Sequence, residues 1–407
     1  MCSSDLRPAR VSYRLVWSVV AITGLAICLF VGAVHRDRGS RAFAAAPVPT
    51  RSTRVQVRAA KPIRPRSYRV PGVRSLVSSS GQLRRALAHL SRKTIVLADG
   101  TYRAAQAFVN ARGDRIYAQH LGRAKLTAGL VIGAAHGPVG AVVRGVVFDV
   151  ADSGATEDGA AIDVWGSATS TRILDVTIDG HKRIGSGILA RQTRGLRVQR
   201  VIARRFTSYG VYADAYPDYG PLPRPMVLTD IDATQVSRPV PRSANGTAEA
   251  CLWVGSRAIV QRVHVADCAW MGVWTGTGTS KSLLEDLDVD RTHVGIYAEH
   301  YTQQTTFRRF RVGPAVVTGV VCEWDNPKTG GKPVCVQDTF ADGMVDSTRN
   351  GVYLDEGTSR TTVTGVTFRN QTRAGIVNYR GDQNVFTRND FTQLAPGAIP
   401  ITDDPKS

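Results

Sequence analysis

Gly295-Ile296-Tyr297-Ala298 is the most informative part of the 407-residue chain, because its pattern returns many times. Each copy is a glycine followed by alternating small or apolar residues, and neighbouring copies are often 23 or 24 residues apart. Such a period is typical of solenoids, whose turns stack on one another to bury a shared core. The copies begin at Gly187, Gly210, Gly272, Gly295, Gly319, Gly351 and Gly375, with shorter variants at Gly159 and Gly397.

A second apolar signal keeps the same period, with apolar residues at positions 0, +3 and +5 of each copy. Ile173, Val176 and Ile178 form one copy, and Phe307, Phe310 and Val312 form another. Short β-rich runs that repeat in one register predict parallel strands, each turn lying roughly 4.8 Å from the next. The spacing therefore predicts a coil with two strands in each turn.

A short helix is expected to begin this coil. Ser79 and Gln82 form a capping box for residues 81–90, whose Leu83, Leu87 and Leu90 share one helical face. Residues 94–102, TIVLADGTY, read as a strand that ends in a turn. A helix at this position would cover the open end of the first turn.

The helix with its TIVLADGTY strand and the repeats such as Gly351-Val352-Tyr353-Leu354 resemble the right-handed parallel β-helix proteins of the pectin lyase-like superfamily. The resemblance covers about residues 75–400, with residues 401–407 as a short tail. It implies an all-β solenoid. The superfamily contains pectate lyases, polygalacturonases, alginate epimerases and adhesins without catalytic activity, so the fold alone does not choose a reaction.

Residues 15–34, which begin at Leu15 and end at Val34, form an uncharged apolar run long enough to cross a membrane as a helix. We expect an uncleaved anchor, preceded by a tail of residues 1–14, with the C-terminal part outside the cytoplasm at a bacterial cell surface. The alternative is cleavage near Ala46 and secretion. Residues 35–74 have the Pro- and Arg-rich composition of a disordered linker. Residues 1–6 match a translated sequencing adapter, so the natural N-terminus is expected to differ.

The basic charge lies mostly at the front of the chain. Residues 1–75 hold 14 of the 52 Lys and Arg residues and 2 of the 33 Asp and Glu residues, leaving 38 and 31 in the remainder. A nucleic-acid-binding domain would concentrate Lys and Arg on its folded surface. The composition therefore argues against a nucleic-acid partner.

Four cysteines lie in the predicted coil, at Cys251, Cys268, Cys322 and Cys335. An even number fits disulfides outside the cell, with three possible connectivities. The pairs nearest in sequence are Cys251 with Cys268 and Cys322 with Cys335. Four buried thiols are the competing interpretation.

Two outward columns follow from the period of two along each glycine strand. Counted from each glycine, with Ala250 in place of the missing one, the +2 column contains several aromatic residues and is expected to be exposed. Aromatic faces stack on sugar rings, so this column suits a polysaccharide, although ordinary β-propensity also favours aromatics. The +2 column reads Leu189, Tyr212, Leu252, Trp274, Tyr297, Val321, Tyr353 and Val377.

The +4 column stacks three acids, Glu299, Glu323 and Asp355, on successive turns. Their mutual repulsion is relieved by a shared proton, a bound cation or basic neighbours. A shared proton makes an acid/base pair suited to glycosidic hydrolysis, and Ca²⁺ is the cation that these oxygen ligands would hold. Salt bridges to Arg308, Arg309 or Arg380 are the non-functional alternative. The full column reads Asp163, Arg191, Asp214, Val254, Gly276, Glu299, Glu323, Asp355 and Tyr379.

The sequence therefore predicts a membrane-anchored, extracytoplasmic β-helix that binds and hydrolyses a polysaccharide. The candidate catalytic residues are Glu299, Glu323, Asp355 and His300, and the first three are also the candidate Ca²⁺ ligands. A surface or cell-wall-binding protein without catalysis is the alternative, and a Ca²⁺-dependent lyase or epimerase is a further one. The candidate substrate-binding residues are Tyr212, Asp214, Trp274, Tyr297, Tyr301, Trp324, Tyr353 and Arg380.

Overall fold

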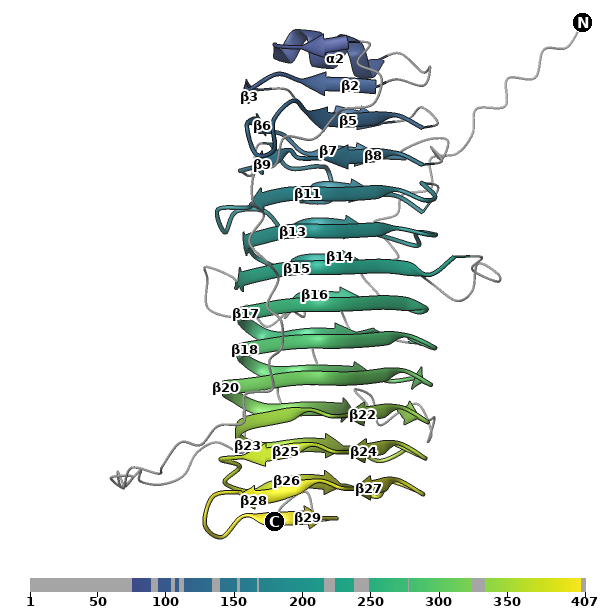
Figure 1. Cartoon of the computed structure of the whole chain (residues 1–407), viewed down its shortest axis with the longest axis vertical. Helices are drawn as coiled ribbons and strands as arrows, with labels where there is room; N and C mark the ends of the chain where they lie inside the picture. Colours follow the sequence, from purple (N-terminus) through teal and green to yellow (C-terminus); the bar gives the residue numbers. More distant parts are fainter. Residues whose placement is uncertain are drawn as a thin grey trace, which may run out of the picture. The chain divides into compact units, whose positions relative to one another are not determined.

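The protein is a coil of parallel β-strands, each turn hydrogen-bonded to the next (Figure 1). This computed structural model describes residues 75–88, 94–103, 107–109, 113–133, 140–151, 154–166, 168–215, 224–237, 249–276, 278–323 and 334–403. All of them belong to one compact unit, Arg54–Pro239 with Glu249–Ser407. The predicted β-solenoid is therefore confirmed at the level of an all-β parallel coil.

One side of the coil, which we call the glycine face, carries the repeated glycine strands. Its strands pair in parallel from one turn to the next, and in the longest strands the C-terminal part contributes. They are β4 Ala107–Val109, β7 Leu130–Ile132, β10 Ala160–Val164, β12 Ser186–Ala190, β14 Tyr209–Ala213, β16 Ala250–Val254, β17 Ala258–Thr275, β18 Leu283–Glu299, β20 Thr306–Glu323, β23 Met344–Leu354, β26 Ala374–Asn378 and β29 Ile399–Thr402.

A second face begins with the strand before the helix and uses the N-terminal parts of the long strands. Its strands are β1 Ser75–Val77, β2 Thr94–Leu97, β5 Arg115–Ala118, β8 Val142–Arg144, β11 Arg172–Asp179, β13 Arg197–Phe206, β15 Met226–Val236, β22 Thr339–Ala341, β24 Thr362–Thr364 and β27 Val385–Thr387, together with the starts of β17, β18 and β20.

A third face follows the second after a bend. It consists of β3 Gly100–Tyr102, β6 Ala124–Leu126, β9 Val147–Asp149, β25 Thr367–Arg369 and β28 Asp390–Gln393, together with later parts of β11, β13, β15, β17, β18 and β20 and the start of β23. A separate two-stranded pair joins β19 Thr302–Gln303 to β21 Cys335–Val336.

The second apolar signal is therefore two strands, where the sequence predicted one. Ile173 lies on the second face, whereas Val176 and Ile178 lie on the third. Between them Asp175 has a φ of 54°, in the left-handed region that L-residues seldom adopt. This residue bends the strand, which explains why positions 0 and +3 both point into the core.

The bend positions form a column of alternating charge, which we call the charge ladder. Strand register places one residue of each turn directly above the next. Arg200 pairs with Asp175, Arg262 with Asp230 at 2.7 Å, and Arg309 with Asp286 at 2.8 Å. All seven members have positive φ: Asp175, Arg200, Asp230, Arg262, Asp286, Arg309 and Asp342.

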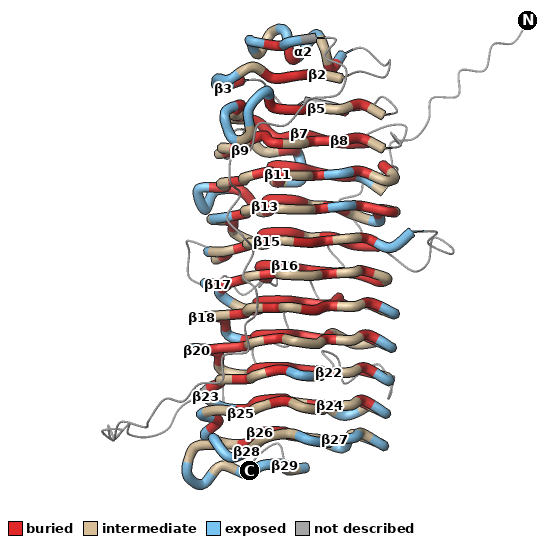
Figure 2. Tube along the Cα trace, viewed as in Figure 1, coloured by how far each residue is buried: buried red, intermediate tan, exposed pale blue. Residues whose placement is uncertain are grey.

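Apolar side chains fill the interior of the coil, and Figure 2 shows buried segments in successive turns. Stacked phenylalanines occupy part of it, with the rings of Phe307 and Phe340 4.8 Å apart. Disulfides join Cys251 to Cys268 and Cys322 to Cys335, the pairs nearest in sequence, and all four residues are buried. These covalent links lie within the region that carries the candidate site.

The predicted N-terminal helix is present as α2, Ser80–Ala88. The backbone N–H of Gln82 donates to Ser79 Oγ, and the Gln82 side chain accepts from the Ser78 backbone N–H. Leu83 and Leu87 are buried against the first turns, while residue 90 lies outside the described residues. The predicted strand 94–102 is divided into β2 and β3 by a turn at Ala98 and Asp99.

The predicted membrane span, residues 15–34, also lies outside the described residues, as does the linker to residue 74. Within the described part of the chain, no helix is long and apolar enough to cross a membrane.

Candidate functional site

The glycine face carries the outward columns that the sequence selected, with a corrected register. Tyr209 pairs with Ala250 and Tyr212 with Trp253, so Cys251 stands where other turns have glycine. Trp253, and not Leu252, therefore belongs to the +2 column, and Gly255 replaces Val254 in the +4 column. Asp163 pairs with Leu189, which moves it from the +4 column to the +2 column.

Four aromatic side chains on consecutive turns form what we call the aromatic ladder. The rings of Tyr212 and Trp253 are stacked with centroids 4.3 Å apart. Trp253 meets Trp274 edge to face at 6.5 Å, and Trp274 meets Tyr297 in the same way at 5.8 Å. Edge-to-face and offset-stacked aromatic pairs are both favourable geometries.

The aromatic ladder is not the exposed stripe that the sequence predicted. Trp253, Trp274 and Tyr297 are 8%, 9% and 5% exposed, and Tyr212 and Tyr353 are partly buried. The side chains pack on one another along the coil, so much of each ring is covered by its neighbours. The ladder therefore supports the face, and little of its ring surface is available for stacking on sugars.

Gly276 provides the space that Trp253 occupies. A Cβ atom at position 276 would lie 1.7 Å from Cζ2 of Trp253, well inside van der Waals contact. Gly255 has a similar role for Asp214, whose Oδ1 would lie 2.7 Å from an added Cβ. These two glycines separate Asp214 from the acids further along the +4 column.

Glu299 and Glu323 occupy the same register on paired strands β18 and β20. Asp355 follows in the next turn, where its backbone N–H donates to the Cys322 carbonyl at 2.9 Å. The structure thus stacks the three predicted acids on consecutive turns. Glu323 is exposed, and Asp355 is partly buried.

Glu299 is hydrogen-bonded to one neighbouring side chain and lies close to a second. Trp274 Nε1 donates to Glu299 Oε2 at 3.2 Å, and His300 Nδ1 lies 3.6 Å from Glu299 Oε1. The Glu299 side chain is 14% exposed. Through Trp274, its third member, the aromatic ladder therefore contacts and orients a candidate catalytic carboxylate.

The negative charges of the acid stack contribute to raised pKa values of two nearby tyrosines. Burial, followed by the charges of Asp355 and Glu323, raises the pKa of the Tyr353 hydroxyl above its usual value. Tyr353 donates to Asp355 Oδ1 at 3.4 Å. Burial and then the charges of Glu299 and Glu249 raise the pKa of Tyr209 to about 12.

The arginines of the salt-bridge alternative contact other acids. Arg308 and Arg309 pair with Glu285, at 2.7 and 2.8 Å, on the second face. Arg380 lies 3.2 Å from Glu356 and over the ring of Tyr379. The expectation that these three arginines neutralise the acid stack is therefore not supported by their pairings.

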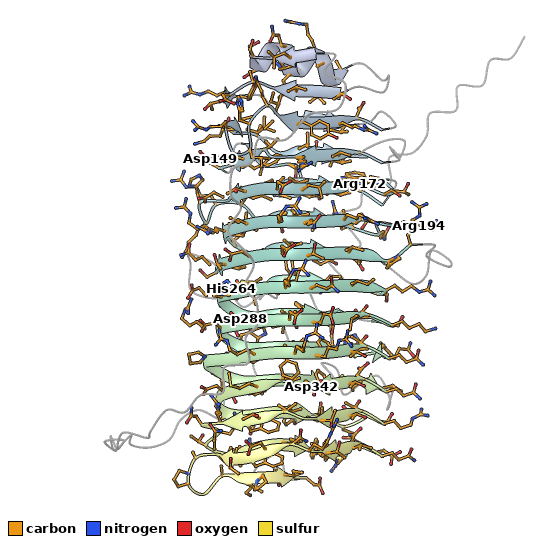
Figure 3. All side chains as sticks on the ribbon, in the orientation of Figure 1. Asp149, Arg172, Arg194, His264, Asp288 and Asp342 are labelled. Carbon is orange, nitrogen blue, oxygen red and sulfur yellow. A yellow bond between two sulfur atoms is a disulfide. The ribbon has the colours of Figure 1, made fainter. Side chains whose placement is uncertain are left out.

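Other ion pairs gather on the third face, away from the acid stack. His264 lies 3.2 Å from Asp232, and Arg311 contacts Asp288. Figure 3 shows Asp149, His264 and Asp288 following one another down one edge of the coil. Hydrogen bonding to Asp232 is the main cause that raises the pKa of His264.

Asp214 does not lie where a substrate-binding carboxylate is expected. Its side chain is 4% exposed, and burial raises its pKa to about 7. The remaining candidates are dispersed: Tyr301 packs its ring 5.4 Å from that of His300, and Trp324 lies outside the described residues.

A second group of polar residues on this face was missed by the sequence analysis. Asp158 and Asp163 are hydrogen-bonded to each other, and Arg191 contacts both, beside the exposed Trp165. Ala161, and not Gly159, occupies the glycine position of this turn. Counting from Ala161 would have placed Asp163 and Trp165 at +2 and +4 and indicated the group.

The arrangement of the described residues does not support the hypothesis of a Ca²⁺ site. Among the described residues, no group of three or more His, Cys, Asp or Glu side chains is arranged to hold a metal ion. The stacking of Glu299, Glu323 and Asp355 on successive turns therefore does not make the three residues a set of metal ligands.

The fold defines the chain as a parallel β-helix protein. No protein-family model matches the chain, and no curated protein matches it in sequence. It is similar in structure to PfbA, a surface adhesin of Streptococcus pneumoniae, with a TM-score of 0.53 and 12% identity over 79% of this chain and 88% of that one. It is also similar to the catalytic domain of a GH87 α-1,3-glucanase in complex with nigerose, with a TM-score of 0.54 and 13% identity over 81% and 70%. Such low identities establish a common fold alone.

Proposed function

We propose that the protein binds a polysaccharide on its glycine face and hydrolyses it with Glu299 and Glu323. The observation that carries this proposal is the shared register of the two glutamates on paired strands. Neighbouring strands lie roughly 4.8 Å apart, and retaining glycosidases separate their two carboxyl groups by about 5 Å. The spacing therefore favours a retaining mechanism.

In this mechanism Glu323, the more exposed glutamate, attacks the anomeric carbon and forms a glycosyl ester. Glu299 donates its proton to the departing glycosidic oxygen. Water then hydrolyses the ester while Glu299 takes up a proton again. Trp274 holds Glu299 in position through its hydrogen bond. His300, which lies beside Glu299, is suited to pass the proton to solvent.

We assign substrate contacts to Tyr212, Tyr301, Tyr353 and Arg380, which lie at or beside the two outward columns, and to Asp355 at the end of the acid stack. Trp324 remains in the proposal because it follows Glu323 directly in the sequence. The fold shared with an α-1,3-glucanase that binds nigerose makes α-1,3-glucan the first polysaccharide to test.

The test compares the hydrolysis of α-1,3-glucan and of a panel of other polysaccharides by wild type, E299Q and E323Q, each as the full chain. We expect release of reducing sugar to fall at least 10³-fold in each variant, while retention by the polymer in affinity electrophoresis persists. D382N is the control, because Asp382 is an exposed acid that has no part in the proposed site. Equal hydrolysis by wild type and both variants would contradict the assignment.

A second candidate function is binding without catalysis. PfbA, which shares the fold, is a surface adhesin. Tight polysaccharide binding with no product from any polymer in the panel would support this candidate and exclude hydrolysis.

We also propose that residues 15–34 anchor the protein in a membrane with the coil outside the cytoplasm, and that the chain belongs to the pectin lyase-like superfamily. The support for both is the sequence pattern. Membrane fractionation with external protease digestion tests the anchor, because a chain lacking residues 15–34 should appear in the soluble fraction. Recovery of mature protein beginning near Ala46 would favour cleavage and secretion.

A further inference from the structure

Trp165 stands apart from the aromatic ladder because it is exposed. It follows β10 on the glycine face, and 39% of its surface is accessible, whereas Trp253 and Trp274 are below 10%. Its Nε1 donates to Asp163 Oδ2 at 3.0 Å, and the Arg191 guanidinium lies 5.9 Å from its ring centre. One edge of the indole is therefore fixed by polar groups while part of the ring remains open.

The charges of Asp158, Asp163 and Arg191, which lie beside Trp165, compensate one another. Burial, followed by the hydrogen bond that its protonated form donates to Asp158, raises the pKa of Asp163 to about 7. Burial also acts to raise the pKa of Asp158, but hydrogen bonds from Arg191 and Asp163 bring it below its usual value. Between about pH 4 and pH 7 the group thus holds one protonated carboxyl, one carboxylate and one guanidinium, with no net charge.

This combination suits a neutral sugar. The apolar face of a pyranose ring can pack on an exposed indole, while its hydroxyls exchange hydrogen bonds with a carboxylate and a guanidinium. The side chains of Asp158 and Arg191 are each 34% exposed and can reach a ligand. An anionic sugar would have to compete with Asp158 for Arg191, so neutral units are preferred.

The position of this group relative to Glu299 sets the length of the ligand. Asp163 lies in the same outward column as Tyr212, separated from it by one turn. The pairing from β10 to β18 takes five steps, through β12, β14, β16 and β17. At roughly 4.8 Å a step the two places are about 24 Å apart, a distance that several linked sugars span and a disaccharide does not.

We propose that Trp165, Arg191 and the Asp158–Asp163 pair form a second carbohydrate subsite, which binds a neutral sugar unit of a long chain at the N-terminal end of the glycine face. The proposal takes its substrate class from the proposed function. It concerns binding, however, and does not depend on turnover at Glu299.

The experiment measures binding of α-1,3-linked gluco-oligosaccharides of two to eight units to the full chain by calorimetry, in the E299Q background so that no probe is consumed. W165A and D158A are compared with W270A, which removes an indole that stacks on His293 instead. We expect W165A and D158A to weaken binding of the longest probes about 10-fold, with the disaccharide unaffected. W165F should restore most of the affinity that W165A loses.

Two results would overturn the subsite. One is unchanged binding of every probe by both W165A and D158A, and the other is a Trp165-dependent preference for oligogalacturonates over the neutral probes. Trp165-dependent binding by a protein that hydrolyses nothing would retain the subsite while removing the hydrolase proposal. Failure of the two proposals is therefore distinguishable.

Discussion

Gly276 lies directly against the indole of Trp253, so close that a single added carbon would overlap the ring at 1.7 Å. Trp253 in turn stacks on Tyr212 and meets Trp274, which donates a hydrogen bond to Glu299. The absence of a side chain at position 276 is thus connected to the orientation of a candidate catalytic residue through two ring contacts.

Gly276→Ala is expected to displace Trp253 and lower the free energy of unfolding by about 1–3 kcal/mol, because overpacking strains a filled interior. Urea unfolding followed by tryptophan fluorescence measures the loss. Gly81→Ala is the control: an added Cβ in α2 would make only an ordinary contact with Arg85 Nη1 at 3.7 Å, so this change should be neutral or stabilising. An unaltered G276A transition would show that Trp253 does not need this space.

Trp274→Phe keeps most of the ring and removes the Nε1–H that binds Glu299. If Glu299 acts in hydrolysis, we expect kcat to fall about 10-fold with little change in KM, because a misoriented acid affects the chemical step more than binding. Trp270→Phe serves as the control. A loss confined to KM would instead indicate that Trp274 contacts the substrate.

Asp214→Asn tests a buried carboxyl whose pKa burial raises to about 7. The unfolded chain releases this proton near pH 4, so between pH 4 and 7 the folded state holds more protons, and rising pH disfavours folding. The asparagine variant lacks this penalty. Its stability relative to wild type should therefore grow from pH 4 to pH 7 by up to about 4 kcal/mol and then level off, as followed by urea unfolding at each pH. Asp382→Asn, at an exposed position, is the comparison; parallel curves for D214N and wild type would refute the assignment.

Arg200→Met tests the charge ladder. Burial acts to raise the pKa of Asp175, but hydrogen bonds from Arg200 and Arg144 outweigh burial and lower it. A depressed pKa stabilises the fold above about pH 4 and loses that effect as pH falls through the folded value. We expect R200M to lose about 1–3 kcal/mol at pH 7 and less at pH 3, by chemical denaturation. Arg380→Met, whose pair with Glu356 is exposed, should lose under about 1 kcal/mol.

Replacing Cys251 and Cys268 together by alanine removes a disulfide that closes 17 residues inside the coil. Loop-closure entropy predicts a loss of roughly 3 kcal/mol, measurable as a lower urea midpoint. Cys28→Ala, outside both disulfides, should leave the midpoint unchanged. A double variant with wild-type stability would mean that stacking alone constrains this segment.

The glycine repeat predicts most of the register correctly because strand pairing repeats the same positions. It failed where another residue replaced glycine: Cys251 occupies that position in one turn, Ala161 in another, and Pro400, instead of Gly397, in the strand β29. Counting from Gly159 was wrong by two positions, which kept Asp163 on the outward face but placed it in the wrong column. Counting from Ala250 was wrong by one position and removed Trp253 from the aromatic ladder. Because side-chain direction has a period of two, a slip of one position reverses the face.

The third face and the burial of the ladder were less accessible from the sequence. Asp175 and the equivalent residues of other turns adopt positive φ. Aspartate and arginine do not indicate such a bend in a sequence, whereas glycine does. The exposure of Trp274 and Tyr297 depends on aromatic neighbours from other turns. The place of one of these neighbours, Trp253, depends in turn on the space that Gly276 leaves. The alternation of residue types along one strand indicates toward which face each side chain points. It contains no information on which residues of other turns cover that side chain.

The alternation of aspartate and arginine from Asp175 to Asp342 limits how this coil can change in length. Loss of the turn that carries Arg262 would place Asp230 beside Asp286, and duplication of it would place two arginines together. Loss or gain of two adjacent turns preserves the alternation. We therefore expect related proteins whose coil is shorter or longer in the middle to differ from this one by an even number of turns. The charge alternation would in this way restrict which repeat numbers evolve.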